Sequence, residues 1–115
     1  MVNCIAALPD ARIDEILSMA GELIWTAGPL KKGANLCHGT AGNGYAFLKL
    51  FQLTQDEKWL YRARRFAMHA IEQCERDHQQ HEQLRYSLWT GDLGLAIYLW
   101  QCIQTADAFP TMDCF

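Results

Sequence analysis

Cys37 and His38 are the residues of this chain best suited to chemistry, because they are adjacent and both are good zinc ligands. The pair stands just before a glycine-rich run, 39–42, that is typical of a helix start. Adjacent side chains bind one ion only where the backbone turns, and a helix N-terminus favours the thiolate form of cysteine. The pair is therefore the strongest candidate for a zinc site in this chain. For the dipeptide alone, an incidental pairing is the commoner interpretation.

The remaining histidines and cysteines are predicted to be structural. His69 lies beside polar neighbours, and His78 and His81 lie in a polar stretch, so all three are expected at the surface. Cys74 and Cys102 sit on apolar faces and are expected to be small core residues. The tryptophans are expected to anchor packing rather than to line a ligand site; they are Trp25, Trp59, Trp89 and Trp100.

Composition describes a small globular chain and argues against nucleic acid as a partner. Half of the 115 residues are apolar, one fifth are charged, and the net charge is −3. A chain of this length forms one small domain at most. A duplex-binding protein usually has a basic face, whereas the densest basic cluster here is Arg62, Arg64 and Arg65, interpreted as a solvated helix edge.

The cellular location expected from the sequence is the cytoplasm. Residues 1–10 lack the basic and apolar regions of a signal peptide, and the longest apolar run, 93–100, is too short to span a bilayer. The five cysteines are odd in number and widely spaced, with no CxxC pair, so a disulfide framework is not expected.

Apolar spacing predicts four helices. The first begins with Asp10 as its N-cap and ends at Gly28-Pro29, and the second covers about 40–53 and is apolar on nearly every side. The third begins with a capping box in which Thr54 and Glu57 satisfy each other's backbone donors, and its polar end, 77–83, is expected to be a loop. The fourth covers about 92–105, and the tail 106–115 has no firm pattern.

The chain contains an internal repeat. Two glycine-bounded runs, 39–42 and 91–94, each lead into an apolar helix and lie 52 residues apart. This is typical of helical hairpins with apolar helices inside and amphipathic ones outside. The glycines permit close approach of a backbone or a ligand, and for the second run tight packing is the favoured interpretation. Two repeats cannot close a ring, so the chain either associates through open inner-helix flanks or is part of something longer.

Three stretches, 30–48, 53–63 and 86–94, resemble the LanC-like family, the relatives of lanthionine cyclases, and look closest to its eukaryotic-type branch. The resemblance implies an all-α fold in which helical hairpins form part of an (α/α) toroid or barrel that is incomplete in this chain. Residues 1–115 are accordingly expected to be a single partial domain, the C-terminal portion of that toroid.

The resemblance also implies functional residues. Cys37 and His38 match two of the family's three zinc ligands, whereas the third, a cysteine in an upstream tryptophan-cysteine motif, has no match here and Cys4 does not resemble it. The family's general acid/base residues also lie upstream. Lys32 falls on a family position that contacts glutathione, although a solvated loop lysine is an equal alternative. Arg85 lies where a second glutathione-contacting segment is poorly matched and is left unassigned.

The chemistry implied by the resemblance is thiol addition. Zinc with three protein ligands keeps a fourth position open for a substrate thiol, which adds to a dehydroamino acid in a peptide or protein and makes a thioether. In the LanC-like branch the thiol is glutathione. With two zinc ligands and no acid/base group, the 115-residue chain is expected to be inactive alone. The alternative is a non-catalytic helical-repeat module that binds glutathione or a protein.

Overall fold

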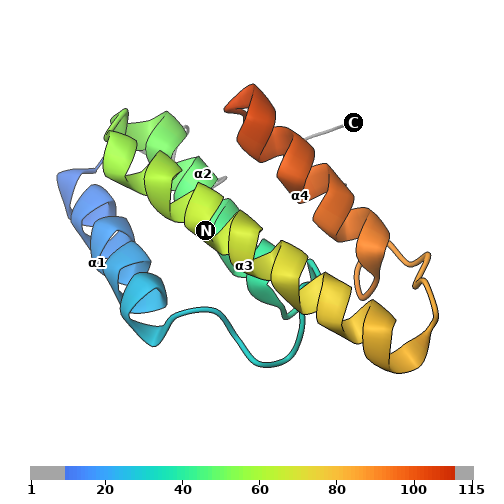
Figure 1. Cartoon of the computed structure of the whole chain (residues 1–115). Helices are drawn as coiled ribbons and strands as arrows, with labels where there is room; N and C mark the ends of the chain where they lie inside the picture. The colour runs from blue at the N-terminus through green and yellow to red at the C-terminus, as the bar shows by residue number, and fades with distance from the viewer. Residues whose placement is uncertain (1–9, 111–115) are drawn as a thin grey trace.

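The computed structural model describes residues 10–110, and these form four helices with no strand in that range. They are α1 (Ala11–Ala27), α2 (Thr40–Thr54), α3 (Glu57–His81) and α4 (Asp92–Gln104). The all-α class predicted from the sequence is therefore confirmed. In Figure 1, α1 and α4 lie on opposite sides of the pair formed by α2 and α3. Within 10–110, every helix is too short or too polar to cross a membrane.

Helix α2 lies at the centre of the core and packs against each of the other three helices. Its apolar side chains on nearly every side made this burial predictable. Phe47 is fully buried, with its ring centroid 6.0 Å from that of Trp59 and 5.0 Å from that of Phe66, both on α3. Burial of an aromatic side chain of this size contributes about 2 kcal/mol or more from the hydrophobic effect.

The N-cap of α3 differs from the prediction. Asp56, not Thr54, caps the helix, and its carboxylate accepts a hydrogen bond from the Lys58 backbone N–H at 3.0 Å. Thr54 instead ends α2, and its hydroxyl donates to the Leu50 carbonyl at 2.8 Å. The predicted capping box between Thr54 and Glu57 is wrong because α2 continues through Thr54 and that hydroxyl satisfies a carbonyl of the helix it ends.

Helix α3 also ends later than predicted. It continues to His81, and the chain leaves it at Glu82 in a left-handed conformation with φ 50°. The loop expected from residue 77 therefore begins about five residues later, at 82. Polar residues do not break a helix that faces solvent on one side, and the opposite face of this last segment still packs against the start of α4. The added turn carries His78.

Helix α1 docks on α3 through charge and aromatic contacts. Arg62 Nη2 lies 2.8 Å from Glu22 Oε2, and the Arg62 guanidinium lies over the rings of Trp25 and Trp59. The Arg62 side chain is only 15 % exposed. Its prediction as part of a solvated helix edge is therefore wrong, because an arginine covers apolar surface with its stem while its head finds a carboxylate.

The two glycine-bounded runs form equivalent junctions. Gly39 and Gly91 are the N-caps of α2 and α4, with φ/ψ of −108°/−168° and −120°/−166°. A methyl group added to Gly39 would collide with the Gly33 carbonyl, and one added to Gly91 with the Arg85 carbonyl. In both copies the obstacle lies six residues before the glycine. Tight backbone packing, the favoured interpretation of the second run, is confirmed.

The hydrogen bonds of the junctions repeat as well. The Thr40 N–H donates to the Gly33 carbonyl at 3.0 Å, and the Asp92 N–H donates to the Arg85 carbonyl at 2.8 Å. Both bonds span seven residues. They give an unsatisfied N–H of each helix start a partner in the preceding loop. The repeat inferred from 52-residue spacing is therefore a repeat in three dimensions.

Apolar side chains remain uncovered on the outer sides of α1 and α4. They are Ile16, Met19 and Leu23 on α1, and Leu93, Trp100 and Ile103 on α4. Trp100 is 58 % exposed, so its predicted role as a packing anchor is wrong within the described residues. The open flank expected for an apolar inner helix is present at α4; association through it stays a prediction.

Candidate functional site

Cys37 and His38 lie in the turn immediately before α2, and both side chains are exposed. Two hydrogen bonds hold the backbone there. The Cys37 N–H donates to the Trp89 carbonyl at 2.8 Å, and the His38 N–H donates to Asn35 Oδ1 at 3.0 Å. The backbone turn required for two adjacent ligands is therefore present, and the first of these bonds ties one junction of the repeat to the other.

The pair supplies two donors at most within the described part of the chain. Among residues 10–110, no third Cys, His, Asp or Glu side chain joins Cys37 and His38 in a group close enough to hold one ion. Cys4, rejected on sequence grounds as the third ligand, lies outside the described residues. A complete zinc site at this turn would need a donor from outside 10–110.

The three described cysteines differ in their surroundings. Cys37 is exposed, Cys74 is half-buried and Cys102 is buried. Burial raises the pKa of the Cys102 thiol to about 11. Burial, followed by the nearby Asp92 carboxylate, raises the pKa of the Cys74 thiol to about 11 as well. The core position predicted for Cys102 is confirmed. Cys74 is half-buried and packs against the core, and its sulfur also contacts His78 and Asp92.

Lys32 and Arg85 line the same small cavity, of about 30 Å³. Cys74, Asp77 and Asp92 also line it, so the two cations face three groups that are acidic or can become so. A cavity of this volume has room for about one water molecule. The sequence placed Lys32 on a glutathione-contacting position and left Arg85 unassigned; their shared cavity was not predictable from either position alone.

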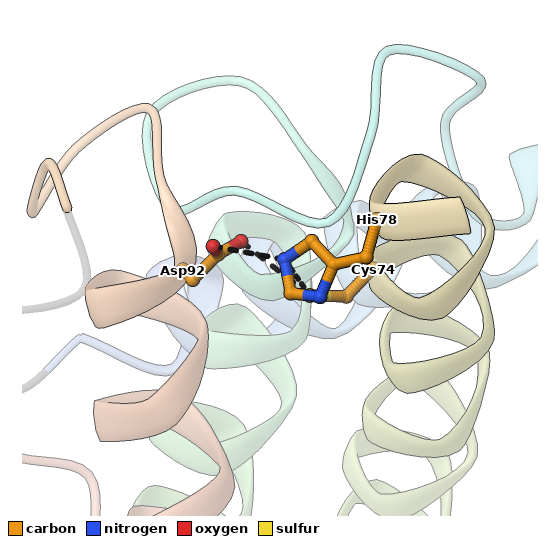
Figure 2. A group of neighbouring side chains, drawn as sticks. All are labelled: Cys74, His78 and Asp92. Carbon is orange, nitrogen blue, oxygen red and sulfur yellow. Dashed lines mark hydrogen bonds and ion pairs between the residues drawn. The ribbon is translucent and has the colours of Figure 1, made fainter. Parts of the chain in front are cut away.

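A cluster of Cys74, His78 and Asp92 was missed by the sequence reasoning. Cys74 Sγ lies 3.7 Å from His78 Nε2 and 3.4 Å from Asp92 Oδ1, and His78 Nε2 lies 3.0 Å from Asp92 Oδ2. Figure 2 shows the two α3 side chains turned toward the first residue of α4. Among 10–110, these three form the one group of Cys, His, Asp or Glu side chains with the spacing of a metal site.

The sequence contained part of the signal for this cluster. Cys74 and His78 are four residues apart, which places them on one face of a helix. The loop predicted from residue 77 hid that relation. Of the three histidines predicted at the surface, His81 is exposed, whereas His69 and His78 are half-buried. The surface prediction is wrong for His78, which contacts α4.

Asp92 is the most hydrogen-bonded member of the cluster. Burial by itself raises the pKa of its carboxyl. Hydrogen bonds from the Arg85 backbone N–H, His78 and Cys74 outweigh that effect and hold the pKa below its ordinary range. The carboxylate is therefore ionised at neutral pH and joins α3 to α4.

Comparison with known proteins identifies the family. The family model described as lanthionine synthetase C-like protein matches residues 1–114. This chain belongs to the LanC-like family. The resemblance drawn from residues 30–48, 53–63 and 86–94 is thereby confirmed.

Two curated relatives extend this result. The LanC-like chain is 45 % identical over 94 residues to "Glutathione S-transferase LANCL1" of Danio rerio, covering 81 % of this chain and 23 % of that protein. It is 42 % identical over 96 residues to "LanC-like protein GCL1" of Arabidopsis thaliana, covering 79 % of this chain and 22 % of that protein. The matched region thus spans less than a quarter of either relative.

Proposed function

We propose that this chain contributes part of a zinc-dependent thiol-addition site of a LanC-like protein, with glutathione as the thiol. Cys37 and His38 are proposed as two of the zinc ligands. The observation that carries the proposal is their exposure, side by side, in a hydrogen-bonded turn at the start of α2. The glutathione S-transferase name of the Danio rerio relative supports the choice of thiol.

The donor set suits the ion. Thiolate and imidazole are ligands that zinc prefers, and Cys37 and His38 supply one side chain of each type. Zinc with three protein ligands lowers the pKa of a thiol bound at its open fourth position. The third protein ligand would come from outside residues 10–110, in keeping with a chain that covers less than a quarter of its relatives.

The chain's other contribution is charge. Lys32 is exposed, and we propose that its ammonium group pairs with a glutathione carboxylate. Arg85, on the same cavity, is a candidate for a second such contact. Two cations that line one cavity would each pair with one carboxylate of a dicarboxylate such as glutathione.

The proposed reaction is conjugate addition. The thiol sulfur bonds to the β-carbon of dehydroalanine or dehydrobutyrine, the alkene π bond becomes an enolate, and a proton from an acid completes the thioether. Neither Cys37 nor His38 would supply that proton while serving as a ligand. The 115-residue chain is therefore proposed to bind its ligands without turnover.

Zinc and glutathione binding test the proposal separately from the cluster on α3. In a Cys74→Ser background, zinc content is measured for the parent, for Cys37→Ala and for the control His81→Ala, which removes an exposed histidine of α3. The proposal expects zinc to be lost only with Cys37→Ala. Lys32→Ala should weaken glutathione binding about tenfold. Equal zinc content in all three proteins would contradict it.

The alternative is a non-catalytic module that binds glutathione or a protein. The uncovered apolar side chains on α1 and α4 favour it, because exposed apolar stripes often mark protein contacts. A Cys37→Ala/His38→Ala double variant separates the two functions. If the double variant binds glutathione as well as the parent does, and the parent holds no zinc, the non-catalytic module is supported. A thioether assay with glutathione and a dehydroalanine peptide shows separately whether turnover occurs.

A further inference from the structure

We infer that Cys74, His78 and Asp92 form a second transition-metal site, between α3 and α4 and separate from the Cys37-His38 turn. The inference rests on the geometry and donor types of the three side chains. It does not depend on the thiol-addition proposal, since none of its residues belongs to that pair.

The spacing of the donor atoms fits one ion. The separations are 3.7 Å from Cys74 Sγ to His78 Nε2, 3.4 Å from that sulfur to Asp92 Oδ1, and 3.0 Å from that nitrogen to Asp92 Oδ2. Tetrahedral zinc with ordinary bond lengths places sulfur and nitrogen about 3.6 Å apart, sulfur and a carboxylate oxygen about 3.5 Å apart, and nitrogen and that same oxygen about 3.3 Å apart. The sulfur–nitrogen and sulfur–Oδ1 pairs match this spacing within about 0.1 Å. One ligand atom from each residue lies within 4.8 Å of the others, so an ion needs only a modest movement of the Asp92 carboxylate.

The supporting groups of the site are already in place. Cys74 and His78 project from successive turns of α3, and Asp92 is the first residue of α4. Asp92 Oδ2 accepts a hydrogen bond from the Arg85 backbone N–H at 2.9 Å, which leaves Oδ1, the oxygen nearer the sulfur, for the ion. Metal-bound carboxylates are commonly held by an outer hydrogen bond of this kind.

A catalytic Cys-His-Asp triad is excluded by which ring nitrogen is used. In a triad, the nucleophile and the acid contact opposite nitrogens of the imidazole, so that a proton can pass between them. Here Cys74 and Asp92 both face His78 Nε2. The sulfur, the nitrogen and the carboxylate instead form a triangle with sides of 3.0 to 3.7 Å, which surrounds a common point.

The donors also select the class of ion. One sulfur, one imidazole nitrogen and one carboxylate oxygen suit Zn²⁺ or Co²⁺, whereas Ca²⁺ and Mg²⁺ prefer oxygen alone. Binding releases the thiol proton, and the thiolate and carboxylate then neutralise the ion's two charges. A neutral site is compatible with Lys32 and Arg85, which line the adjoining cavity. That cavity, of about 30 Å³, has room for a water molecule as fourth ligand.

Cobalt titration of the full 115-residue chain tests the inference. In the Cys37→Ala/His38→Ala double variant, one equivalent of Co²⁺ should bind and produce a thiolate-to-cobalt charge-transfer band. Adding Cys74→Ser should abolish the band, and adding His78→Gln or Asp92→Asn should weaken binding ~100-fold or more, since outer-shell changes alone cost 10–100-fold. His81→Gln, one turn further along α3, is the matched control and should leave binding unchanged.

The outcomes are decisive in both directions. Absence of the band in the Cys37→Ala/His38→Ala variant, or its persistence after Cys74→Ser, overturns the inference. Circular dichroism checks that each variant keeps its helices. If a variant does not fold, X-ray absorption of the cobalt-loaded double variant replaces it: one sulfur with nitrogen and oxygen neighbours supports the site, and a shell without sulfur refutes it.

Discussion

The junctions at 33–42 and 85–94 have the same backbone and different side chains. Each has a glycine N-cap packed against the preceding loop and a seven-residue hydrogen bond to the first residue of a helix. The first junction has Cys37-His38 in its turn, where the second has Trp89-Thr90. At the first helical residue it is the second copy that has an ionisable side chain: Thr40 in the first copy is neutral, whereas Asp92 in the second is charged.

This difference teaches that one repeated backbone framework can hold reactive side chains at two different positions. Both first helical residues contact α3. Thr40 donates to Gln73 Oε1 at 2.5 Å in a buried hydrogen bond, and Asp92 meets Cys74 and His78. One copy therefore has exposed cysteine and histidine side chains in its turn and a packing contact at its helix start, whereas the other has a polar cluster at its helix start.

Glycine substitution should produce the largest effect and tests whether the two junctions are equivalent. Gly39→Ala and Gly91→Ala should each reduce the free energy of unfolding by about 3 kcal/mol, because the new methyl group meets a backbone carbonyl that cannot move aside. Urea denaturation measures the loss. Gly28→Ala is the control: its new methyl group meets nothing within 4 Å, and only the backbone strain of φ 74° and ψ −177°, about 1–3 kcal/mol, applies. A large loss at one junction alone would break the equivalence.

Cysteine labelling should separate the exposed turn from the cluster. Cys37 is exposed, whereas burial and Asp92 raise the pKa of Cys74 to about 11, so at pH 7 roughly one Cys74 thiol in 10⁴ is ionised. In metal-free buffer, iodoacetamide should modify Cys37 at least ~100-fold faster than Cys74, as followed by peptide mass spectrometry. Buried Cys102, whose pKa is also raised to about 11, is the slow internal reference. Comparable modification rates at Cys37 and Cys74 would contradict the difference in accessibility between the exposed turn and the α3–α4 cluster.

Thr40→Val should have a smaller effect and sharpens the role of the first helix start. It removes a buried hydroxyl and leaves Gln73 Oε1 without that donor, at a cost of about 1–2 kcal/mol in unfolding free energy. Thermal or urea unfolding measures it. Thr40→Ser restores the hydroxyl and should recover most of the loss; failure of Ser to do so would assign the effect to packing of the methyl group.

Lowering the pH should produce the smallest effect, by removing the contribution of Asp92, at the start of α4, to the free energy of unfolding. The folded-state pKa of Asp92 is lowered, so its contribution is present above the unfolded-state pKa and is lost as pH falls through the folded value, below pH ~4. The side chain is 34 % exposed, and solvent screening keeps the loss under about 1 kcal/mol. Unfolding curves of the parent and Asp92→Asn should converge at low pH. An unchanged gap between them would remove Asp92 from the pH dependence.

Much of the fold was predictable because it depends on local patterns. The helix that starts at Asp10 and stops at Gly28 follows from an N-cap and a residue that adopts positive φ readily, here 74°. Because residues 40–53 are apolar on nearly every side, the burial of α2 in the core was also predictable. The end of α3 was not predictable in this way, because polar residues from 77 onward suit a loop and a solvent-facing helix equally well.

The candidate site likewise has features that the sequence predicts and features that depend on tertiary packing. Cys37 and His38 are adjacent in the chain, so their association, the glycine-started helix behind them and the LanC-like motif around them are properties of the sequence alone. Their exposure, and the bond from the Cys37 N–H to the Trp89 carbonyl, come from the packing of two junctions 52 residues apart.

Sequence by itself determined what depends on neighbours along the chain: the four helices, the repeated glycine starts, the family and the zinc-type dipeptide. Tertiary structure alone decided which distant side chains meet. It brought Asp92 to Cys74 and His78, and Lys32 to Arg85, because these approaches depend on how α2 and α4 pack against α3. Periodicity and capping are local properties, whereas a convergence of sulfur, nitrogen and oxygen from two helices exists only once those helices are packed.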